Sequence, residues 1–289
     1  MVKTKRAVVL VHYDRDNMVD AYLYTYIKAL QAVSSHLVFV STAKLSHTDI
    51  KRLQIECDEV IVRDNVGYDF MSYKTGLESF DYTAYDEVLL CNDSVYGPLY
   101  PMQNLFDMMQ NIKCDFWGVT DNMDMGYHIQ SYFLLFKKSV LSSSVFQNFW
   151  KNVKVLHSKD DIIAQYEVGL SQLLIQHQFI PAASTQFQPT RLQKISIFLR
   201  KFTPKKIVKK VSSLLTGKAK IVRIGKINTT HYFWKELLLS GKVPFIKIEL
   251  LRDNPMDVKI EDYQHVIQKV SEYDTTLIKN HLQRMRKKA

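Results

Sequence analysis

The sequence predicts an α/β protein with a mostly parallel, twisted sheet flanked by helices. Short β-branched runs alternate with amphipathic segments over residues 7–93. Strand–helix–strand repetition at this spacing favours right-handed crossovers between parallel strands. An apolar fraction of 46%, with 12% aromatic residues, suffices for a folded core and excludes wholesale disorder. A length of 289 residues fits one large domain, or one domain with a small appendage.

The first half contains strands and helices in regular succession. Short apolar runs, typical of strands covered on both faces, predict strands at 7–13, 37–42, 59–64 and 87–93. Apolar residues at helical spacing predict helices at 20–33, 46–57 and 69–80. Asp20 and Ser46 are the expected N-caps of the first two helices, because their side chains can accept from a free backbone N–H.

The second half continues with longer segments. An apolar strand is predicted at 128–138, and helices are predicted at 142–153 and 160–179, with Gly169 inside the second. Residues 227–255 contain a short helix, a turn at Gly241 and a strand. Residues 261–289 are expected to form one or two surface helices with a basic tip.

The positive charge belongs to one segment. The chain carries a net +10, and thirteen Lys and Arg residues lie between Glu167 and Glu236 without one acidic residue. Residues 190–226 interleave apolar side chains with these cations, which favours an amphipathic helix on an anionic membrane surface through residues 191–226. Nucleic-acid binding is a competing but less favoured interpretation of this basic segment. A lysine-rich insert that is simply exposed to solvent is the alternative without a function.

The lack of a recognisable targeting signal and the pattern of cysteines predict a cytoplasmic protein. No stretch approaches the roughly 18 consecutive apolar residues that span a bilayer. The first apolar run is interrupted at His12, Tyr13 and Asp14, too early for a secretory signal. The three cysteines are widely spaced without a metal-site pattern, so we expect small buried hydrophobes in a reducing compartment.

Polar residues follow several predicted strands where each strand ends. Ligands of such sheets bind beyond the carboxyl ends of the strands, so Tyr13-Asp14, Asp64-Asn65 and Asn92-Asp93-Ser94 are expected to converge on one crevice. A carboxylate after a buried strand is a common position for a metal that bridges a diphosphate. Turn formation before Gly97-Pro98 explains Asn92 and Ser94 equally well.

The stretch RDNVGYDFMSYKTGL (63–77) is a second candidate, and it includes Lys74. Gly67 permits positive φ and therefore a tight turn between strand and helix. Asn65 and Asp69 flank this turn, and backbone N–H groups at the helix start can face an anion. A simple Asn/Gly loop with Asp69 as N-cap accounts for the same residues.

Four further residues are candidates with ordinary alternatives. Glu167 near a helix start can take a proton from an acceptor hydroxyl, or it can be a solvent-facing carboxylate. His128 and His231 are each weak candidates alone, because a lone histidine is more often a core or surface residue. Asp115, beside Trp117, can bind a sugar hydroxyl over an aromatic platform or cap a turn.

Six stretches between residues 63 and 255 carry a resemblance to a known family. The sequence resembles the rhamnan synthesis protein F family of bacterial glycosyltransferases, in the family's order, through RDNVGYDFMSYKTGL, LLCNDSVYGPLYPM, CDFWGVTDN, HIQSYFLLFKK, FQNFW and HYFWKELLLSGKVPFIKIELLRDNP. The resemblance implies one GT-A-like domain (1–289) with a nucleotide-sugar-binding half (1–125), an acceptor and catalytic half (126–189 and 227–260), a basic segment (190–226) and C-terminal helices (261–289). It further implies an inverting transfer of L-rhamnose from deoxythymidine diphosphate-L-rhamnose (dTDP-L-rhamnose) onto a cell-wall, capsular or O-antigen polysaccharide.

The resemblance also implies roles for the candidate residues. Glu167 matches the catalytic base of inverting GT-A enzymes, and His128 and Gln130 would line the acceptor side with Asp115 and Trp117. The donor would be bound by Tyr13, Asp14, Asn65, Gly67, Asp69, Lys74, Asn92, Asp93 and Ser94. A divalent metal (Mn²⁺ or Mg²⁺) would be held by Asp93 and His231. Because NDS has one carboxylate where the family of folds uses DxD, Asp93 can instead hold ribose or sugar hydroxyls.

The implied partners place the protein on the inner face of the plasma membrane, beside a lipid-linked oligosaccharide or polysaccharide acceptor. Two alternatives stay open. One is a transferase for another nucleotide-activated sugar in surface polysaccharide assembly. The other is a non-catalytic basic protein that binds polyanions, which would show no donor hydrolysis.

Overall fold

The computed structural model describes residues 4–123, 125–185 and 228–286, which belong to one compact unit. The basic segment 190–226, with its expected membrane contact, lies outside the described residues. Within the described residues, no helix is both long enough and apolar enough to cross a bilayer.

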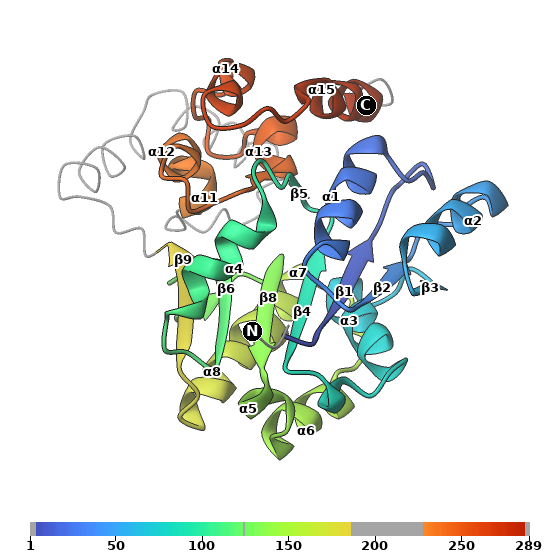
Figure 1. Cartoon of the computed structure of the whole chain (residues 1–289), viewed down its shortest axis with the longest axis vertical. Coiled ribbons are helices and arrows are strands. Elements are labelled where there is room, and N and C mark those ends of the chain that lie inside the picture. Colours follow the sequence, from blue (N-terminus) through green and yellow to red (C-terminus); the bar gives the residue numbers. More distant parts are fainter. Residues whose placement is uncertain (1–3, 124, 186–227, 287–289) are drawn as a thin grey trace, which may run out of the picture. The chain divides into compact units, whose positions relative to one another are not determined.

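An eight-stranded sheet forms the centre of this unit (Figure 1). Its order is β3-β2-β1-β4-β8-β6-β7, and β9 pairs with β6. The strands are β1 (Arg6–His12), β2 (His36–Ser41), β3 (Glu59–Val62), β4 (Glu87–Asn92), β6 (Phe116–Asn122), β7 (His128–Ile129), β8 (Phe133–Lys137) and β9 (Pro181–Thr185). All strands except β7 and β8 point the same way. The predicted α/β fold with a mostly parallel sheet is therefore confirmed.

The helices of the first half connect the parallel strands as predicted. They are α1 (Ala21–Gln31), α2 (His47–Glu56) and α3 (Tyr68–Glu78), followed by the short 3-10 helix η1 (Tyr82–Ala84) and α4 (Met102–Gln110). The Ser46 hydroxyl accepts from the Asp49 N–H at 3.1 Å, which confirms the predicted cap of α2. Asp20 precedes α1, but its carboxylate makes no capping hydrogen bond. The prediction of an Asp20 side-chain cap is therefore wrong.

The middle of the chain differs from the prediction in two places. The predicted strand 128–138 is divided into β7 and β8, because residues 130–132 leave the ladder. The predicted helices are present as α6 (Ser144–Asn152) and, for 160–179, as α7 (Lys159–Ile162) and α8 (Gly169–Gln176). The short helix α5 (Lys138–Leu141) directly after β8 was not predicted. A π-helical turn, η2 (Ile163–Val168), joins α7 to α8. Such turns often occur at functional sites.

The C-terminal segment returns to the carboxyl end of the sheet (Figure 1, orange and red). It contains α11 (Thr229–Tyr232), α12 (Trp234–Leu239), β10 (Ile246–Lys247), α13 (Ile248–Asp253), α14 (Tyr263–Gln268) and α15 (Thr275–Arg286). β10 pairs antiparallel with β5 (Val95–Tyr96), just beyond the end of β4. α15 packs against α1 and α13 and buries Ile278, His281 and Leu282. α15 is thus an amphipathic surface helix with basic residues in its last turn.

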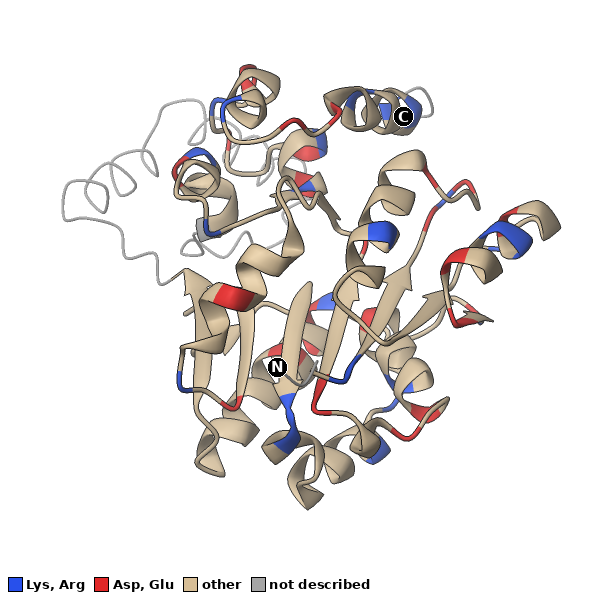
Figure 2. Cartoon of the chain, viewed as in Figure 1, with Lys and Arg blue, Asp and Glu red and all other residues tan. Residues whose placement is uncertain are grey.

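The core lies on both faces of the sheet, and β1 is buried along its whole length. Figure 2 shows the charged residues mainly on helices and at strand ends. The three cysteines are free and buried, as expected.

Close packing of α3 on the sheet depends on Gly76. A Cβ atom at this position would lie 2.4 Å from Val9 Cγ1 and 3.1 Å from Val40 Cγ2. We expect Gly76→Ala to lower the free energy of unfolding by about 1–3 kcal/mol, because overpacking outweighs the gain in helix propensity. Gly169→Ala is the matched control, since the nearest atom to its added Cβ is the Ala164 carbonyl oxygen at 3.5 Å. Urea denaturation measures both, and equal midpoints would contradict this packing argument.

Candidate active site

The site begins where β4 ends and α3 starts. The Asn92 side chain donates from Nδ2 to Asp69 Oδ2 at 2.8 Å. Its Oδ1 accepts from the Ser94 N–H at 3.2 Å and from the Ser94 hydroxyl at 2.6 Å. Asp69 reaches this position because Gly67, at φ 73°, turns the chain into α3. The structure thus joins residues 69, 92 and 94, which the sequence places in separate motifs.

Lys247 on β10 is the cation of this site, and the sequence reasoning missed it. Its ammonium donates to the Ser94 hydroxyl at 3.3 Å and lies 3.6 Å from the centre of the Tyr132 ring. Burial lowers the pKa of Lys247 to about 8, although the charges of Glu167, Glu249 and Asp69 oppose this shift. A lysine within the apolar run VPFIKI was the available signal.

Glu167 lies in the π-helical turn η2 and contacts the β7–β8 connection. Its Oε2 accepts from the Ser131 N–H at 3.3 Å and from the Ser131 hydroxyl, and its Oε1 lies 3.3 Å from His128 Nε2. His128 Nδ1 lies 2.9 Å from the Gly126 carbonyl oxygen, which can only accept, so Nδ1 carries a proton. The side chain of Glu167 is 18% exposed. The solvent-facing alternative for Glu167 is therefore wrong.

Hydrogen bonds keep the Glu167 carboxylate ionised. Burial raises its pKa, but the hydrogen bonds from His128 and Ser131 and the positive charges of His128 and Lys247 together lower it below the usual range. The opposite holds for Asp69, where burial raises the pKa more than the Asn92 hydrogen bond and Lys247 lower it. The site therefore stabilises the ionised form of Glu167 and disfavours the ionised form of Asp69.

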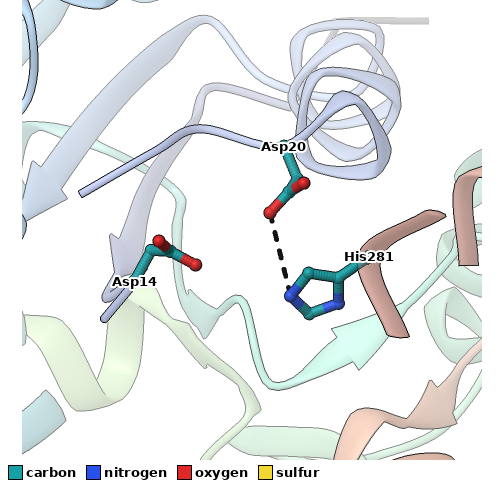
Figure 3. Close-up of side chains that lie close together, drawn as sticks. All are labelled: Asp14, Asp20 and His281. Carbon is teal, nitrogen blue, oxygen red and sulfur yellow. Dashed lines mark ion pairs between the residues drawn. The ribbon is translucent and has the colours of Figure 1, made fainter. Parts of the chain in front are cut away.

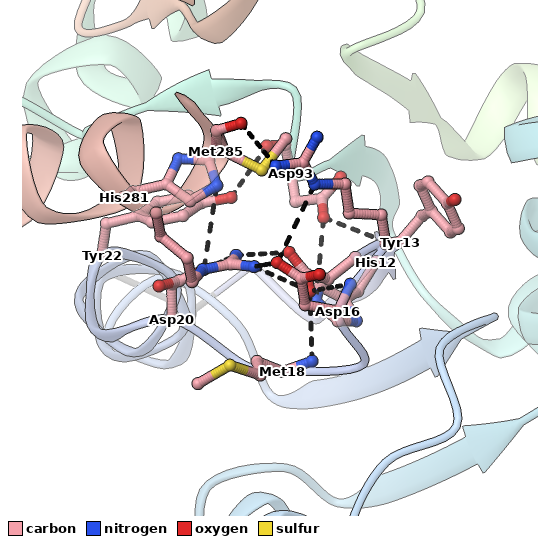
Figure 4. Close-up of polar contacts among 12 residues, drawn as sticks. His12, Tyr13, Asp16, Met18, Asp20, Tyr22, Asp93, His281 and Met285 are labelled. Carbon is pink, nitrogen blue, oxygen red and sulfur yellow. Dashed lines mark hydrogen bonds and ion pairs between the residues drawn. The ribbon is translucent and has the colours of Figure 1, made fainter. Parts of the chain in front are cut away.

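The side chain of Asp93 lies at the end of β1 and is not part of the hydrogen bonds that join Asp69, Asn92 and Ser94 (Figure 4). Its Oδ2 accepts from the Tyr13 N–H at 3.0 Å and lies 3.9 Å from His12 Nε2. Burial raises the pKa of Asp93 well above its usual value, and the charges of Asp69 and Asp14 add to this effect. The Tyr13 side chain is 52% exposed, so its ring is accessible for stacking.

Asp14 belongs to an ion network with the C-terminal helix. Arg284 of α15 forms ion pairs with Asp14, Asp16 and Asp20. Figure 3 shows Asp14 and Asp20 beside His281, whose Nε2 lies 3.7 Å from Asp20 Oδ2. Because Arg284 already compensates these carboxylates, Asp14 is structurally engaged rather than open to a ligand.

Two predicted acceptor residues lie at the end of the sheet where the parallel strands begin, opposite to the site. The Asp115 carbonyl accepts from the Lys137 N–H at 2.9 Å, and Lys137 pairs with Glu87, the first residue of β4. Asp115 is therefore level with the start of β4, about 16 Å along the strands from Asn92. Its carboxylate accepts from Ser139 and the Ile180 N–H, and Trp117 is buried. The expectation that residues 115 and 117 line the acceptor side is wrong, because they precede or begin a strand that points towards the site.

The remaining predicted residues divide between the site and its surroundings. Gln130 is buried, and its Oε1 accepts from the Thr120 hydroxyl at 2.7 Å, beside Tyr132. Asn65 is exposed on the loop before α3. His231 on α11 is buried, with Nε2 at 3.8 Å from Glu249 Oε2, and Lys247 lies near enough to lower its pKa.

Lys74 has structural partners instead of a place at the site. Its ammonium donates at 3.0 Å to the carbonyls of Lys151 and Val153 at the end of α6. We expect Lys74→Met to lower the free energy of unfolding by about 1.5–3 kcal/mol, the range for hydrogen bonds to charged groups, without changing nucleotide affinity. Lys51→Met, at an exposed position of α2, is the control. Denaturation together with nucleotide titration tests this, and weakened nucleotide binding at unchanged stability would restore the donor-binding role of Lys74.

The donor set does not fit the predicted metal pair. Asp93 faces His12 and the Tyr13 N–H, whereas His231 faces Glu249. Over the described ranges, the one group of three His, Cys, Asp or Glu side chains close enough to share an ion is Asp14, Asp20 and His281. That group already holds the guanidinium of Arg284. We therefore assign no chemical step to a metal bound by residues 93 and 231.

Comparisons with known proteins identify relatives of the chain. The family model for rhamnan synthesis protein F matches residues 37–228. The virulence protein VirA of Vibrio anguillarum is 31% identical over 208 residues, which is 69% of this chain and 64% of VirA. The uncharacterised protein y4gN of Sinorhizobium fredii is 28% identical over 177 residues, 59% of this chain and 46% of y4gN. The chain therefore spans less than two thirds of the length of these curated relatives.

One solved structure that is similar in part is glucosyl-3-phosphoglycerate synthase from Mycobacterium tuberculosis, in complex with Mn²⁺, uridine-diphosphate-glucose and phosphoglyceric acid. It is 9% identical with a TM-score of 0.35, and the match covers 47% of this chain and 58% of that one. A likeness at this score does not bear on the activity of the present chain.

Proposed function

Because the chain belongs to the rhamnan synthesis protein F family, we propose that it transfers a sugar from a nucleotide-diphosphate donor to an acceptor hydroxyl. One observation carries the proposal: Asp69 of α3, Asn92 of β4, Ser94 of the following turn, Glu167 of η2 and Lys247 of β10 come together at the carboxyl end of β4. Nucleotide ligands of such sheets bind at this end, beyond the carboxyl ends of the parallel strands.

Glu167 is the general base of the proposed reaction. Its ionised carboxylate accepts the proton of the acceptor hydroxyl while that oxygen attacks the anomeric carbon of the donor sugar. The bond from this carbon to the diphosphate breaks, and the diphosphate leaves with the electron pair. A single displacement inverts the configuration, so a β-linked activated L-rhamnose yields an α-linkage. Three of the roughly four acceptor positions of the Glu167 carboxylate are engaged by Ser131 and His128, and the fourth remains for the hydroxyl.

The donor side of the proposal uses the ring of Tyr13 and polar groups at the ends of β1 and β4. The exposed side chain of Tyr13 can stack on the base, and Asp93, which accepts from the Tyr13 N–H, can also accept from ribose or sugar hydroxyls. Backbone N–H groups at the start of α3 and the hydroxyl of Ser94 can meet the diphosphate. We propose dTDP-L-rhamnose as donor, which rests on the family description rather than on a contact to the sugar.

The acceptor in this proposal is a growing bacterial surface polysaccharide on a lipid carrier. The family description names rhamnan synthesis, and the basic segment 190–226 suits an anionic membrane surface where a lipid-linked chain would be presented. The protein would then work peripherally on the inner face of the plasma membrane.

Donor binding and turnover test the proposed function directly. We expect one nucleotide sugar of a panel that includes dTDP-L-rhamnose to stabilise the protein, by about 2.7 kcal/mol at a concentration of 100 times its Kd. Slow donor hydrolysis should accompany this binding. Absence of stabilisation and hydrolysis over the panel, together with salt-sensitive binding of polyanions, would instead support a non-catalytic polyanion-binding protein.

A further inference from the structure

We propose that Lys247 binds the diphosphate of the donor and neutralises the charge that it gains as the sugar leaves. The inference deepens the proposed function and rests on it. It assigns to a side chain of β10 the role that a divalent metal has in many phosphate-transferring sites. The stabilised product is a nucleoside diphosphate, so this product is the ligand by which the inference is tested.

The ammonium of Lys247 is available for an anion. Within the part of the chain that the structure describes, it contacts the Ser94 hydroxyl at 3.3 Å and the face of the Tyr132 ring at 3.6 Å. Within residues 4–123, 125–185 and 228–286, no carboxylate forms an ion pair with it inside 4.0 Å. A partly buried cation without a paired carboxylate retains donors for a phosphate oxygen.

Nearby groups explain why such a cation stays in place. The negative charges of Glu167, Glu249 and Asp69 attract Lys247 without contacting it, and Ser94 orients it through the chain that runs to Asn92 and Asp69. Without Lys247, the same carboxylates would repel a diphosphate. Lys247 thus gives an acidic site the charge that an anionic donor requires.

His231 supplies a second, independent observation. Its side chain is 2% exposed, and neither ring nitrogen has a hydrogen-bond partner among the described residues. Burial lowers its pKa to about 4, so the ring is neutral at pH 7 and carries one N–H donor. α11 packs against β10, and the charges of Lys247 and Lys159 act on this ring. Although His231 Nε2 lies 3.8 Å from Glu249 Oε2, this is no hydrogen bond, and a buried donor without a hydrogen bond beside a cation is suited to a phosphate oxygen.

The alternative of a metal at residues 93 and 231 finds less support in the side chains. Asp93 and His231 belong to no group of three side chains that could share an ion among the described residues. Asp93 lies in contact with the β1 end, through Tyr13 and His12, whereas Lys247 contacts Ser94 directly. The geometry therefore favours diphosphate binding by Lys247.

Titration calorimetry with UDP, dTDP, GDP and CDP, in EDTA and then in Mn²⁺ or Mg²⁺, tests the inference. We expect one of these diphosphates to bind the wild-type chain in EDTA, and Lys247→Met to weaken it by about tenfold to a hundredfold. Lys247→Arg keeps the charge and should retain more affinity than Lys247→Met. Lys242→Met, at an exposed position of the same segment, is the matched control and should bind as the wild type does. Thermal unfolding of each variant reports whether it folds.

The pH dependence of diphosphate affinity gives a second readout. As the pH rises through about 8, the free protein loses the Lys247 proton, so affinity should fall by up to about tenfold per pH unit. The charged and titratable groups around it are Glu167, Glu249, Asp69, Lys159 and His231. In Lys247→Arg, this alkaline loss should disappear, because arginine stays charged.

Three outcomes would overturn the inference. Binding that requires the metal and vanishes in EDTA, or a folded Lys247→Met variant with full affinity, contradicts Lys247 as the diphosphate ligand while the proposed function stands. Absence of binding to every diphosphate under both conditions contradicts the proposed function itself, and the inference with it.

Discussion

Replacement of Glu167 by glutamine should lower the rate of sugar transfer by roughly 10²–10⁴-fold, the usual contribution of a general base. Glutamine keeps the size of the side chain and an acceptor oxygen for Ser131, but it cannot take the proton of the acceptor hydroxyl. Donor affinity should change little, because the donor is held at β1, β4 and β10. The loss should therefore appear in kcat rather than in KM of the donor.

Two controls separate catalysis from architecture. Glu236→Gln, at an exposed position of α12, should leave the rate unchanged. Ser131→Ala removes the hydroxyl that lowers the pKa of Glu167, so the acid limb of the pH–rate profile should move to higher pH while transfer persists. A folded Glu167→Gln variant with the wild-type rate would contradict the assignment of the base, and a Ser131→Ala profile without a shift would contradict its positioning by Ser131.

Arg284→Met should produce the largest loss of stability, about 3–5 kcal/mol, the cost of breaking a buried ion pair. Methionine leaves Asp14, Asp16 and Asp20 without their shared cation, and their side chains are 7%, 12% and 19% exposed. Arg284 itself is 18% exposed, so the effect should lie at the lower end of this range. Urea denaturation at pH 7 measures the change in the free energy of unfolding.

The pH dependence of this loss follows from Asp14. Burial raises the pKa of Asp14, but hydrogen bonds from Arg284 and from backbone N–H groups lower it below its usual value. Its contribution is therefore present above the unfolded pKa and is lost as the pH falls through the folded pKa. The difference between wild type and variant should shrink accordingly below about pH 4. Arg286→Met, two residues away on α15, is the control. A fully stable Arg284→Met variant would contradict the network.

Local patterns were sufficient for the elements of the sheet. Strands of β-branched residues and helices with a 3.6-residue period depend on neighbours in sequence, so β1 to β4 and their helices were predicted to within a few residues. The cap at Ser46 is equally local, since donor and acceptor lie three residues apart. The rule that ligands bind beyond the carboxyl ends of parallel strands identified Asn92 as a candidate, and the turn at Gly67 before a helix identified Asp69. The structure places these two side chains in contact.

Strand direction explains the main errors among the site residues. Asp115 and Trp117 were grouped with the acceptor side from their residue types, although Asp115 directly precedes β6 and Trp117 is its second residue. Because β6 points the same way as β4, its first residues lie at the amino-terminal end of the parallel strands, away from the site. Lys74 lies in the same motif as Asp69, but its ammonium reaches the end of α6.

The sequence by itself determined the order of strands and helices up to β4, the Ser46 cap and the polar strand ends, because these depend on residues within a turn or two. Only the tertiary structure decided which charges meet. Lys247 joins Ser94 across 153 positions and Arg284 joins Asp14 across 270. Such contacts depend on how the C-terminal segment pairs with β5 and packs on α1, and spacing along the chain carries no information about that return.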